Sequence, residues 1–325
     1  MAAWLPARTT GSILPSNQNP LGARPARFRR QRLLIVGCGD VGQRVARAVR
    51  GVRLLALTSS PERREALRAQ GITPLPGNLD DPRSLRRLAG LDTRVLHLAP
   101  PPATPEEAPQ WWLDPRTTAL VQALRRRALP QALVYGSTTG VYGDCGGAWV
   151  DESRPAAART GRAMRRVNAE RTLRWAGRQG LRASILRIPG IYAPDRAGGT
   201  PRTRLLRGTP VLRPEDDVYT NHIHADDLAR ACIAALWRGR AQRIYNVADA
   251  SDLRMGDYFD LAADLYGLPR PARVSRSQAQ GELPVTLLSF MGESRRLRTT
   301  RLVRELRVAL RYPHVAQGLR GLPVR

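Results

Sequence analysis

The chain contains no lysine, so all 53 of its basic residues are arginines, against 27 aspartates and glutamates. The formal net charge is +26 at pH 7, a balance that attracts nucleic acids, anionic membrane surfaces and acidic ligands. Aromatic residues make up only 5% of the chain, however, and the arginines are spread along its whole length. Because a stacking platform for single strands needs more aromatics, we expect no specific nucleic-acid binding, only nonspecific contact with polyanions at low salt.

Long apolar runs, cysteine pairs and histidine clusters are also missing. No stretch of 18 or more apolar residues is present, so no membrane span is expected. Cys38, Cys145 and Cys232 are far apart and lack CxxC spacing, which argues against a disulfide framework and for a reducing compartment, here the cytoplasm. Only two histidines, His222 and His224, are close in sequence; we interpret them as ordinary strand residues and predict no metal site.

The first 31 residues hold Pro, Gly, Ser, Asn and Arg without an apolar core. They lack the apolar segment of a secretory signal. We expect residues 1–31 to be a disordered basic tail, or the result of a start placed too early.

From residue 32 onward, short apolar runs alternate with segments of helical periodicity. The runs predicted as strands are 33–37, 52–58, 72–77, 93–99, 132–138, 183–190 and 243–249. The segments predicted as helices are 41–50, 61–70, 81–90, 110–128, 160–179, 224–237, 255–267 and 295–306. This alternation predicts an α/β fold with a doubly wound parallel sheet of Rossmann type. We place the sheet domain at 32–190 and a smaller mixed C-terminal lobe at 191–325, with the strand and helix near 224–249 returning to the sheet.

The glycine pattern GCGDVG, Gly37 to Gly42, follows the first predicted strand and opens the first predicted helix. In that position Gly37 permits the tight turn, Gly39 lets the backbone approach a pyrophosphate, and Gly42 lets the helix pack on the strand. The free N–H groups of the first helical turn, which includes Asp40 and Val41, favour the negative charge of the pyrophosphate. We therefore predict that the sheet domain binds NAD or NADP.

The end of the second predicted strand bears on the choice between NAD and NADP. An NAD site usually has an acid about twenty residues after the glycine pattern, but this place reads LTSS, with no carboxylate. Hydroxyls such as Ser59, with Arg63 and Arg64 nearby, suit a 2′-phosphate, so NADP is the preferred cofactor. The alternative is that both arginines only face solvent. Asn78 and Leu79, after the third predicted strand, are expected beside the adenine ring.

The fifth predicted strand ends in a row of hydroxyls, at the edge of the sheet where ligands bind in such folds. These hydroxyls could bond a substrate oxygen or only cap a turn. From about residue 32 to the end, the chain resembles the extended and atypical short-chain dehydrogenase/reductases, the NAD(P)-dependent epimerase/dehydratase group. The six ordered motifs that carry the resemblance are GxGxxG, HLAPPP (97–102), GSTTGVYGD (136–144), LRIPGIYAP (186–194), NHIHADDLA (221–229) and YNVAD (245–249).

The resemblance implies roles for individual residues. Thr138 falls on the family's catalytic Ser/Thr, which hydrogen-bonds the substrate oxygen, and Ala99 of HLAPPP is expected beside the cofactor. The family's Tyr-x-x-x-Lys should open the helix after the fifth strand, with Glu170 four residues past the lysine. Arg162 then stands at the tyrosine position and Arg166 at the lysine position. Arg166 can still bond the nicotinamide ribose, but the Arg162 guanidinium does not exchange protons near neutral pH.

A general acid/base typically contributes about 10²–10⁴-fold in rate, so without the family's tyrosine the reaction needs another proton donor. Tyr142 and Tyr192 are the nearest hydroxyls by motif. The candidate carboxylates of the loop between them are Asp144, Asp151 and Glu152. The residues expected to line a substrate pocket in the C-terminal lobe are Arg187, Tyr192, Asn221 and His222.

Three functions remain. The first is an oxidoreductase or epimerase-like enzyme for a small polar or sugar-like substrate, with an altered acid/base, and we favour it. The second is a non-catalytic NADP(H)-binding sensor or scaffold, and the third is a nucleic-acid partner supported by charge alone. A homodimer is common in the family, but nothing in this sequence selects it.

Overall fold

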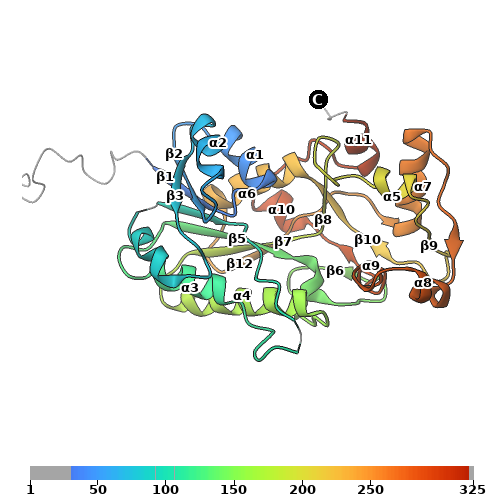
Figure 1. The fold of residues 1–325 in the computed structure, drawn as a ribbon, viewed down its shortest axis with the longest axis horizontal. Helices are drawn as coiled ribbons and strands as arrows, with labels where there is room; N and C mark the ends of the chain where they lie inside the picture. The colour runs from blue at the N-terminus through green and yellow to red at the C-terminus, as the bar shows by residue number, and fades with distance from the viewer. Residues whose placement is uncertain (1–30, 92, 106, 322–325) are drawn as a thin grey trace, which may run out of the picture. The chain divides into compact units, whose positions relative to one another are not determined.

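The computed structural model describes residues 31–91, 93–105 and 107–321, so the expectation for residues 1–30 lies outside the described residues. The centre of the structure is a seven-stranded sheet in which every neighbouring pair is parallel (Figure 1). In spatial order the strands are β12 (Arg243–Asn246), β7 (Ala183–Ile188), β5 (Ala132–Thr138), β4 (Arg94–His97), β1 (Arg32–Val36), β2 (Arg53–Thr58) and β3 (Thr73–Pro76). The predicted doubly wound parallel sheet is confirmed.

The order of the strands reverses between β1 and β4. Within the sheet, the first strand is β1, and the next two, β2 and β3, are added on one side of it. The chain then crosses to the other side of β1, where β4, β5, β7 and β12 are added in turn. Ligands of such sheets bind at this reversal, beyond the carboxyl ends of the strands. Gly37 follows β1 and Ala99 follows β4, so both lie at that edge.

Helices cover both faces of the sheet (Figure 1). One apolar core contains residues of α1 (Asp40–Ala48), α2 (Arg63–Ala69), α6 (Ala225–Arg238) and α10 (Thr300–Arg304). The other core contains residues of η3 (Pro82–Leu88), α3 (Pro115–Leu124) and α4 (Gly161–Arg178). The strands supply fully buried aliphatic side chains to both, as in a parallel sheet covered on two sides.

Two predicted helices differ from the observed ones for local reasons. The segment 110–128 becomes helical only at α3, because Pro115 fits the first helical position and the Asp114 carboxylate accepts hydrogen bonds from the N–H groups of Arg116 and Thr117. The segment 81–90 forms η3, which is a 3₁₀ helix.

The remaining elements are short and gather mainly around a third apolar core, made of residues between Tyr192 and Leu319. The paired strands are β8 (Gly190–Tyr192) with β11 (His222–His224), β10 (Tyr219–Thr220) with β13 (Leu253–Arg254), β9 (Val211–Leu212) with β14 (Arg273–Val274), and β6 (Trp149–Val150) with β15 (Arg296–Leu297). The helices are α5 (Arg202–Leu206), α7 (Met255–Tyr266), α8 (Arg276–Glu282), α9 (Val285–Met291) and α11 (Val315–Arg320). The domain boundary near residue 190 stays a prediction.

The predicted helix over 295–306 is wrong in its first half. Arg296 and Arg298 donate backbone N–H groups to the carbonyls of Ala148 and Val150, at 3.0 and 2.9 Å, which makes β15 a partner of β6. Only α10 is helical, because the long-range strand pairing competes successfully with the helical spacing of the apolar residues.

No helix within residues 31–91, 93–105 and 107–321 is long and apolar enough to span a bilayer. The same residues contain no group of three or more histidine, cysteine or acidic side chains placed to hold a metal ion.

Candidate functional site

The three glycines after β1 each meet a different surrounding. Gly37 has a φ of +85°, and a Cβ there would strike the backbone of Ala99. A Cβ at Gly42 would lie 3.1 Å from the side chain of Ile35, so α1 packs closely on β1 at this point. A Cβ at Gly39 would meet nothing within 4 Å, and no side chain caps α1 there. The open space over Gly39 therefore leaves room for an anionic group at the start of α1.

Two cavities open from this edge of the sheet. The smaller, of about 310 Å³, is lined by the glycine loop with Asp40 and Val41, and it extends to Thr138. The larger, of about 1000 Å³, lies between the end of β5, the start of α4 and the C-terminal lobe. The residues that line both cavities are Thr138, Arg166, Pro189, Ile191 and Arg196. The two cavities therefore adjoin at the end of β5.

Beyond the glycine loop, Arg63 reaches back from the start of α2. Its Nη2 donates a hydrogen bond to the carbonyl of Cys38 at 2.5 Å, and Ser59 is exposed nearby in sequence, just past β2. Asn78 is exposed, with its side-chain oxygen accepting from the N–H of Asp80, whereas Leu79 is buried. These four residues follow the carboxyl ends of β2 and β3, as the sequence predicted, but none of them lines either cavity.

Thr138 and Arg166 lie where the cavities join. Thr138 ends β5, and its Oγ1 accepts from the N–H of Gly140 at 3.3 Å, so it caps η4 (Thr139–Tyr142) and remains half-buried. Arg166, on α4, donates to the carbonyl of Gly136 at 2.6 Å and to the hydroxyl of Tyr135 at 3.1 Å. Both bonds hold the guanidinium against β5, beside Thr138.

Arg162 lies one helical turn before Arg166 on α4 and lines the larger cavity. Its guanidinium stacks on the ring of Phe290 in α9, with 4.3 Å between the guanidinium carbon and the ring centre. Partial burial lowers the pKa of Arg162; Glu293 opposes this shift, and Arg166 and Arg295 add to it. The side chain stays cationic and offers no proton near neutral pH.

Comparison with known proteins identifies the family. The model of the NAD dependent epimerase/dehydratase family matches residues 33–248. The chain belongs to this family. A solved structure of a conserved protein of unknown function from Silicibacter pomeroyi is 31% identical, with a TM-score of 0.72 over 90% of this chain and 98% of that chain.

Two further proteins similar to this member of the epimerase/dehydratase family are named enzymes. A 4-hydroxy-2-methyl-3-oxo-4-farnesyl-3,4-dihydroquinoline-1-oxide ketoreductase of Stigmatella aurantiaca is 25% identical over 313 residues, 88% of this chain and 93% of the relative. A UDP-glucuronic acid 4-epimerase from Bacillus cereus, solved in complex with NAD, has a TM-score of 0.69 at 15% identity, covering 90% of this chain and 97% of that chain. At that identity the likeness concerns the fold alone.

The hydroxyls considered as replacement acids each lie against another residue. Tyr142 is fully buried, and its hydroxyl donates to the side-chain oxygen of Asn246 at 2.7 Å, so it reaches neither cavity. Tyr192 contributes to the wall of the larger cavity, but its hydroxyl faces Gly318, where an added Cβ would strike it. Burial raises the pKa of both tyrosines.

The three candidate carboxylates are committed elsewhere and line neither cavity. Asp144 accepts from the N–H groups of Gly146 and Ser294. Asp151 is exposed and accepts from Ser153. Glu152 is buried; it accepts from the N–H of Asn246 at 3.0 Å, and its other carboxylate oxygen lies 3.4 Å from Arg301.

Glu170 has a structural role beneath the site. Its carboxylate forms a two-bond ion pair with Arg187 of β7, at 3.1 and 2.7 Å, and accepts from the Ser137 hydroxyl at 2.6 Å. We expected Arg187 to line the substrate pocket, but this expectation is wrong. The residue is only 2% exposed and does not line the larger cavity. Of the other expected liners, Asn221 and His222 do contribute, and burial lowers the pKa of His222 to about 4.

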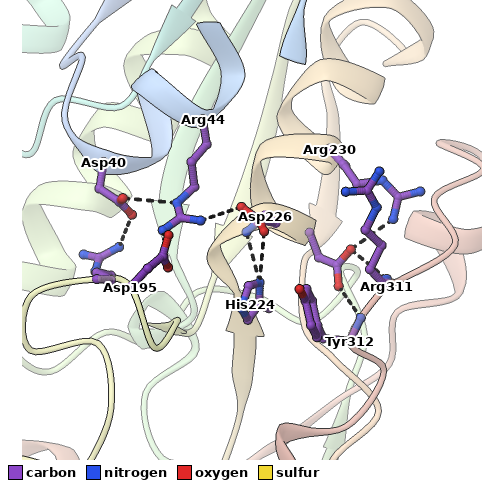
Figure 2. A network of polar contacts seen from close by, with 10 residues as sticks. Asp40, Arg44, Asp195, His224, Asp226, Arg230, Arg311 and Tyr312 are labelled. Atoms are coloured by element: carbon purple, nitrogen blue, oxygen red, sulfur yellow. Dashed lines mark hydrogen bonds and ion pairs between the residues drawn. The ribbon is translucent and has the colours of Figure 1, made fainter. Parts of the chain in front are cut away.

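Figure 2 shows a network of ion pairs beside the glycine loop. Arg44 of α1 bonds three carboxylates: Asp40 of its own helix at 3.1 Å, Asp195 of the loop after β8 at 2.7 Å, and Asp226 of α6. Arg196, the next residue of that loop, pairs with Asp40 at 3.3 Å. This network fixes the loop that carries Arg196 over the junction of the two cavities.

The sequence did not point to several residues of the larger cavity. They are Arg196, Arg204, Phe290, Glu293 and Arg295. Each comes from a loop or a short helix whose placement depends on long-range packing, and no motif or spacing in the sequence marks them.

Proposed function

We propose that this chain is an NAD(P)-dependent oxidoreductase or epimerase-like enzyme acting on a small polar or sugar-like substrate, with NADP as the preferred cofactor. The observation that carries the proposal is the junction of the two cavities at Thr138 and Arg166. A dinucleotide held along the glycine loop and a substrate in the larger cavity would meet at this point. The family of the chain and its ketoreductase relative support a reaction of this class.

The residues present fit the cofactor, which when bound gives or takes a hydride. The open space over Gly39 accommodates a pyrophosphate at the start of α1, and Arg166 is placed to bond ribose hydroxyls. The Thr138 hydroxyl, whose Oγ1 already accepts from Gly140, is free to donate to a substrate oxygen.

Gly39 gives the sharpest test of cofactor binding. Its φ is −82° and an added Cβ meets nothing, so Gly39→Ala should fold normally yet crowd the pyrophosphate. We expect NADPH affinity, measured calorimetrically at moderate salt, to fall about tenfold or more through lost N–H contacts. Gly281→Ala, also in open space, is the matched control and should leave affinity unchanged. Equal affinities in all three proteins, or no binding of NADPH or NADH to the parent, would contradict the proposal.

The NADP preference rests on the absence of a carboxylate at the end of β2 and on the position of Arg63 beside the glycine loop. Arg63→Ala should weaken NADPH binding about tenfold while changing NADH binding little, because only NADPH carries the 2′-phosphate. Arg68→Ala, an exposed arginine of the same helix, is the control. Equal loss for both cofactors would argue against this role.

A non-catalytic NADP(H)-binding sensor is the second candidate, because Arg162 cannot donate a proton and the hydroxyls of both candidate tyrosines lie against other residues. The double substitution Arg162→Tyr with Arg166→Lys separates the two. Gain of carbonyl reduction would indicate a site that lost its acid/base. Loss of NADPH binding would indicate that the arginines are present-day ligands of the cofactor.

A further inference from the structure

The larger cavity is strongly basic. Six of the residues that line it are arginines, at positions 162, 165, 166, 196, 204 and 295, and a single acid, Glu293, lines it with them. Its other walls include aromatic and aliphatic side chains such as Tyr258, Phe259, Leu287 and Phe290. A cavity with this lining favours a ligand that has both negative charge and an apolar part.

Two of the six arginines pair with carboxylates, and a third is buried against backbone carbonyls. Arg295 pairs with Glu293 at 2.8 Å, and Arg196 pairs with Asp40 at 3.3 Å. Arg165 is buried and donates to the carbonyls of Thr104 and Trp111, at 3.0 and 2.9 Å. The charges of Arg295 and Arg196 are therefore balanced within the protein, and the Arg165 guanidinium is held by backbone groups.

The other three, like Arg165, have no carboxylate partner among residues 31–91, 93–105 and 107–321. Arg166 bonds only a carbonyl and a tyrosine hydroxyl, and Arg162 stacks on Phe290. Arg204 stacks on Phe259, with 4.2 Å to the ring centre, and its Nε and Nη2 are buried without a hydrogen-bond partner. Leaving such groups unpaired costs free energy that an oxyanion would recover.

Arg162 and Arg166 are neighbours on one face of α4, four residues apart, and Arg166 lies beside Thr138. Like charges this close repel, and the acid of the cluster, Glu293, is already paired with Arg295. A carboxylate or phosphate between two guanidinium groups relieves the repulsion and accepts charge-assisted hydrogen bonds from both.

We propose that Arg162 and Arg166 form an oxyanion receptor at the reacting end of the larger cavity, and that its ligand is an organic carboxylate or phosphate whose apolar part packs on Phe290 and Leu287. Arg204, which also lines the cavity without a carboxylate partner in the described part of the chain, adds positive charge and makes a dianion more favourable than a monoanion. Arg162 then binds the substrate's charge at the position where the family resemblance places a proton donor. That this ligand is the substrate rests on the proposed function, whereas its binding does not.

The test uses three small probes, benzoate, phenyl phosphate and benzyl alcohol, titrated calorimetrically into the purified full chain. Salt of about 150 mM, where the Debye length is about 8 Å, suppresses binding to the general positive field. We expect at least one anion to bind about tenfold tighter than the neutral alcohol. The stronger of the two anions identifies the source of the oxyanion as carboxylate or phosphate.

Variants locate the binding. Arg162→Gln should weaken anion binding about tenfold, and Arg162→Lys should recover part of it through its point charge. Arg171→Gln, an exposed arginine of the same helix that lines neither cavity, should change nothing. The proposal fails if the alcohol binds as tightly as the anions, if no anion saturates at millimolar concentration, if Arg162→Gln keeps full affinity, or if Arg171→Gln loses as much.

The same samples are titrated with NADPH. Arg162 does not line the smaller cavity, so Arg162→Gln should keep its NADPH affinity. A parent protein that binds the anion through Arg162 but binds no NADPH would refute the proposed function and leave the receptor standing. A parent protein that binds NADPH but neither anion would refute the oxyanion receptor and leave the proposed function standing.

Discussion

Gly37 brings the turn after β1 against the backbone of the residue that follows β4. Two separate costs face any side chain there, a φ of +85° and a collision with Ala99. Gly71 isolates the first cost, because its φ is +73° but an added Cβ meets nothing within 4 Å. We expect Gly71→Ala to lower the free energy of unfolding by about 1–2 kcal/mol, the penalty of left-handed backbone for an L-residue.

Gly37→Ala should cost clearly more than Gly71→Ala, because the backbone of Ala99 has to move as well. Urea unfolding followed by circular dichroism measures both variants. Equal losses would mean that the close approach at Ala99 relaxes freely, and that Gly37 is needed only for its backbone conformation.

At the scale of elements, the loop after β8 is attached to two helices through Arg44. The side chain is 7% exposed and joins carboxylates of α1, of this loop and of α6 (Figure 2). Arg44→Gln should leave three carboxylates without their shared cation, so the loop over residues 193–199 should open more often. Hydrogen exchange of its amides, including Gly199, which donates to the carbonyl of Arg196 at 2.9 Å, should become faster.

Arg47→Gln is the control, since Arg47 is an exposed arginine of the same helix and takes part in none of these ion pairs. Faster exchange across the whole of α1 in Arg44→Gln would instead indicate general destabilisation. Unchanged exchange in the loop would show that backbone packing alone holds it.

Sequence patterns predicted the sheet strands and the helices α6 and α7 well, and the short C-terminal elements poorly. Strands such as β1 and the first half of β5 are continuous, mostly buried apolar runs, so composition alone identifies them. The β6–β15 pair has two residues on each side. It forms only when two segments almost 150 residues apart in the sequence meet in the fold, and no local sequence pattern indicates that pairing. The same holds for the larger cavity, where Phe290 and Arg204 arrive on short helices.

The glycine loop and Thr138 were predictable because their geometry is local: a turn after a strand, and a hydroxyl at a strand end. Whether Tyr142 could replace the missing acid was not predictable from the sequence. Only the folded chain shows that its hydroxyl donates to the side-chain oxygen of Asn246. Spacing placed Arg162 and Arg166 on one helical face, and the fold added the stacking of Arg162 on Phe290.

At the scale of the whole molecule, buried titratable groups make stability depend on pH in two opposite directions. Burial lowers the pKa of His97 to about 3 and that of His222 to about 4, so both are neutral in the folded chain. Their contribution to stability is complete above the unfolded value of about 6.5 and is lost as the pH falls toward 4.

Asp249 acts in the other direction. The residue is 6% exposed, its Oδ2 has no hydrogen-bond partner in the described part of the chain, and burial raises its pKa to about 8. The unfolded value is about 3.9, so the folded state holds a proton that the unfolded state releases. This contribution is complete below about pH 4 and is lost as the pH rises to about 8.

Asp249→Asn should remove this second dependence. An amide carries no charge at any of these pH values and can still accept from the N–H of Ser251, as Asp249 does at 3.0 Å. The variant should gain stability relative to the parent between pH 4 and pH 8, by on the order of 2–5 kcal/mol at the upper end. Urea midpoints measured at intervals across this range give the difference. A flat difference for Asp249→Asn would mean that the carboxyl is ionised in the folded chain, with water or a cation reaching it through the cavity that Ser251 and Arg298 also line.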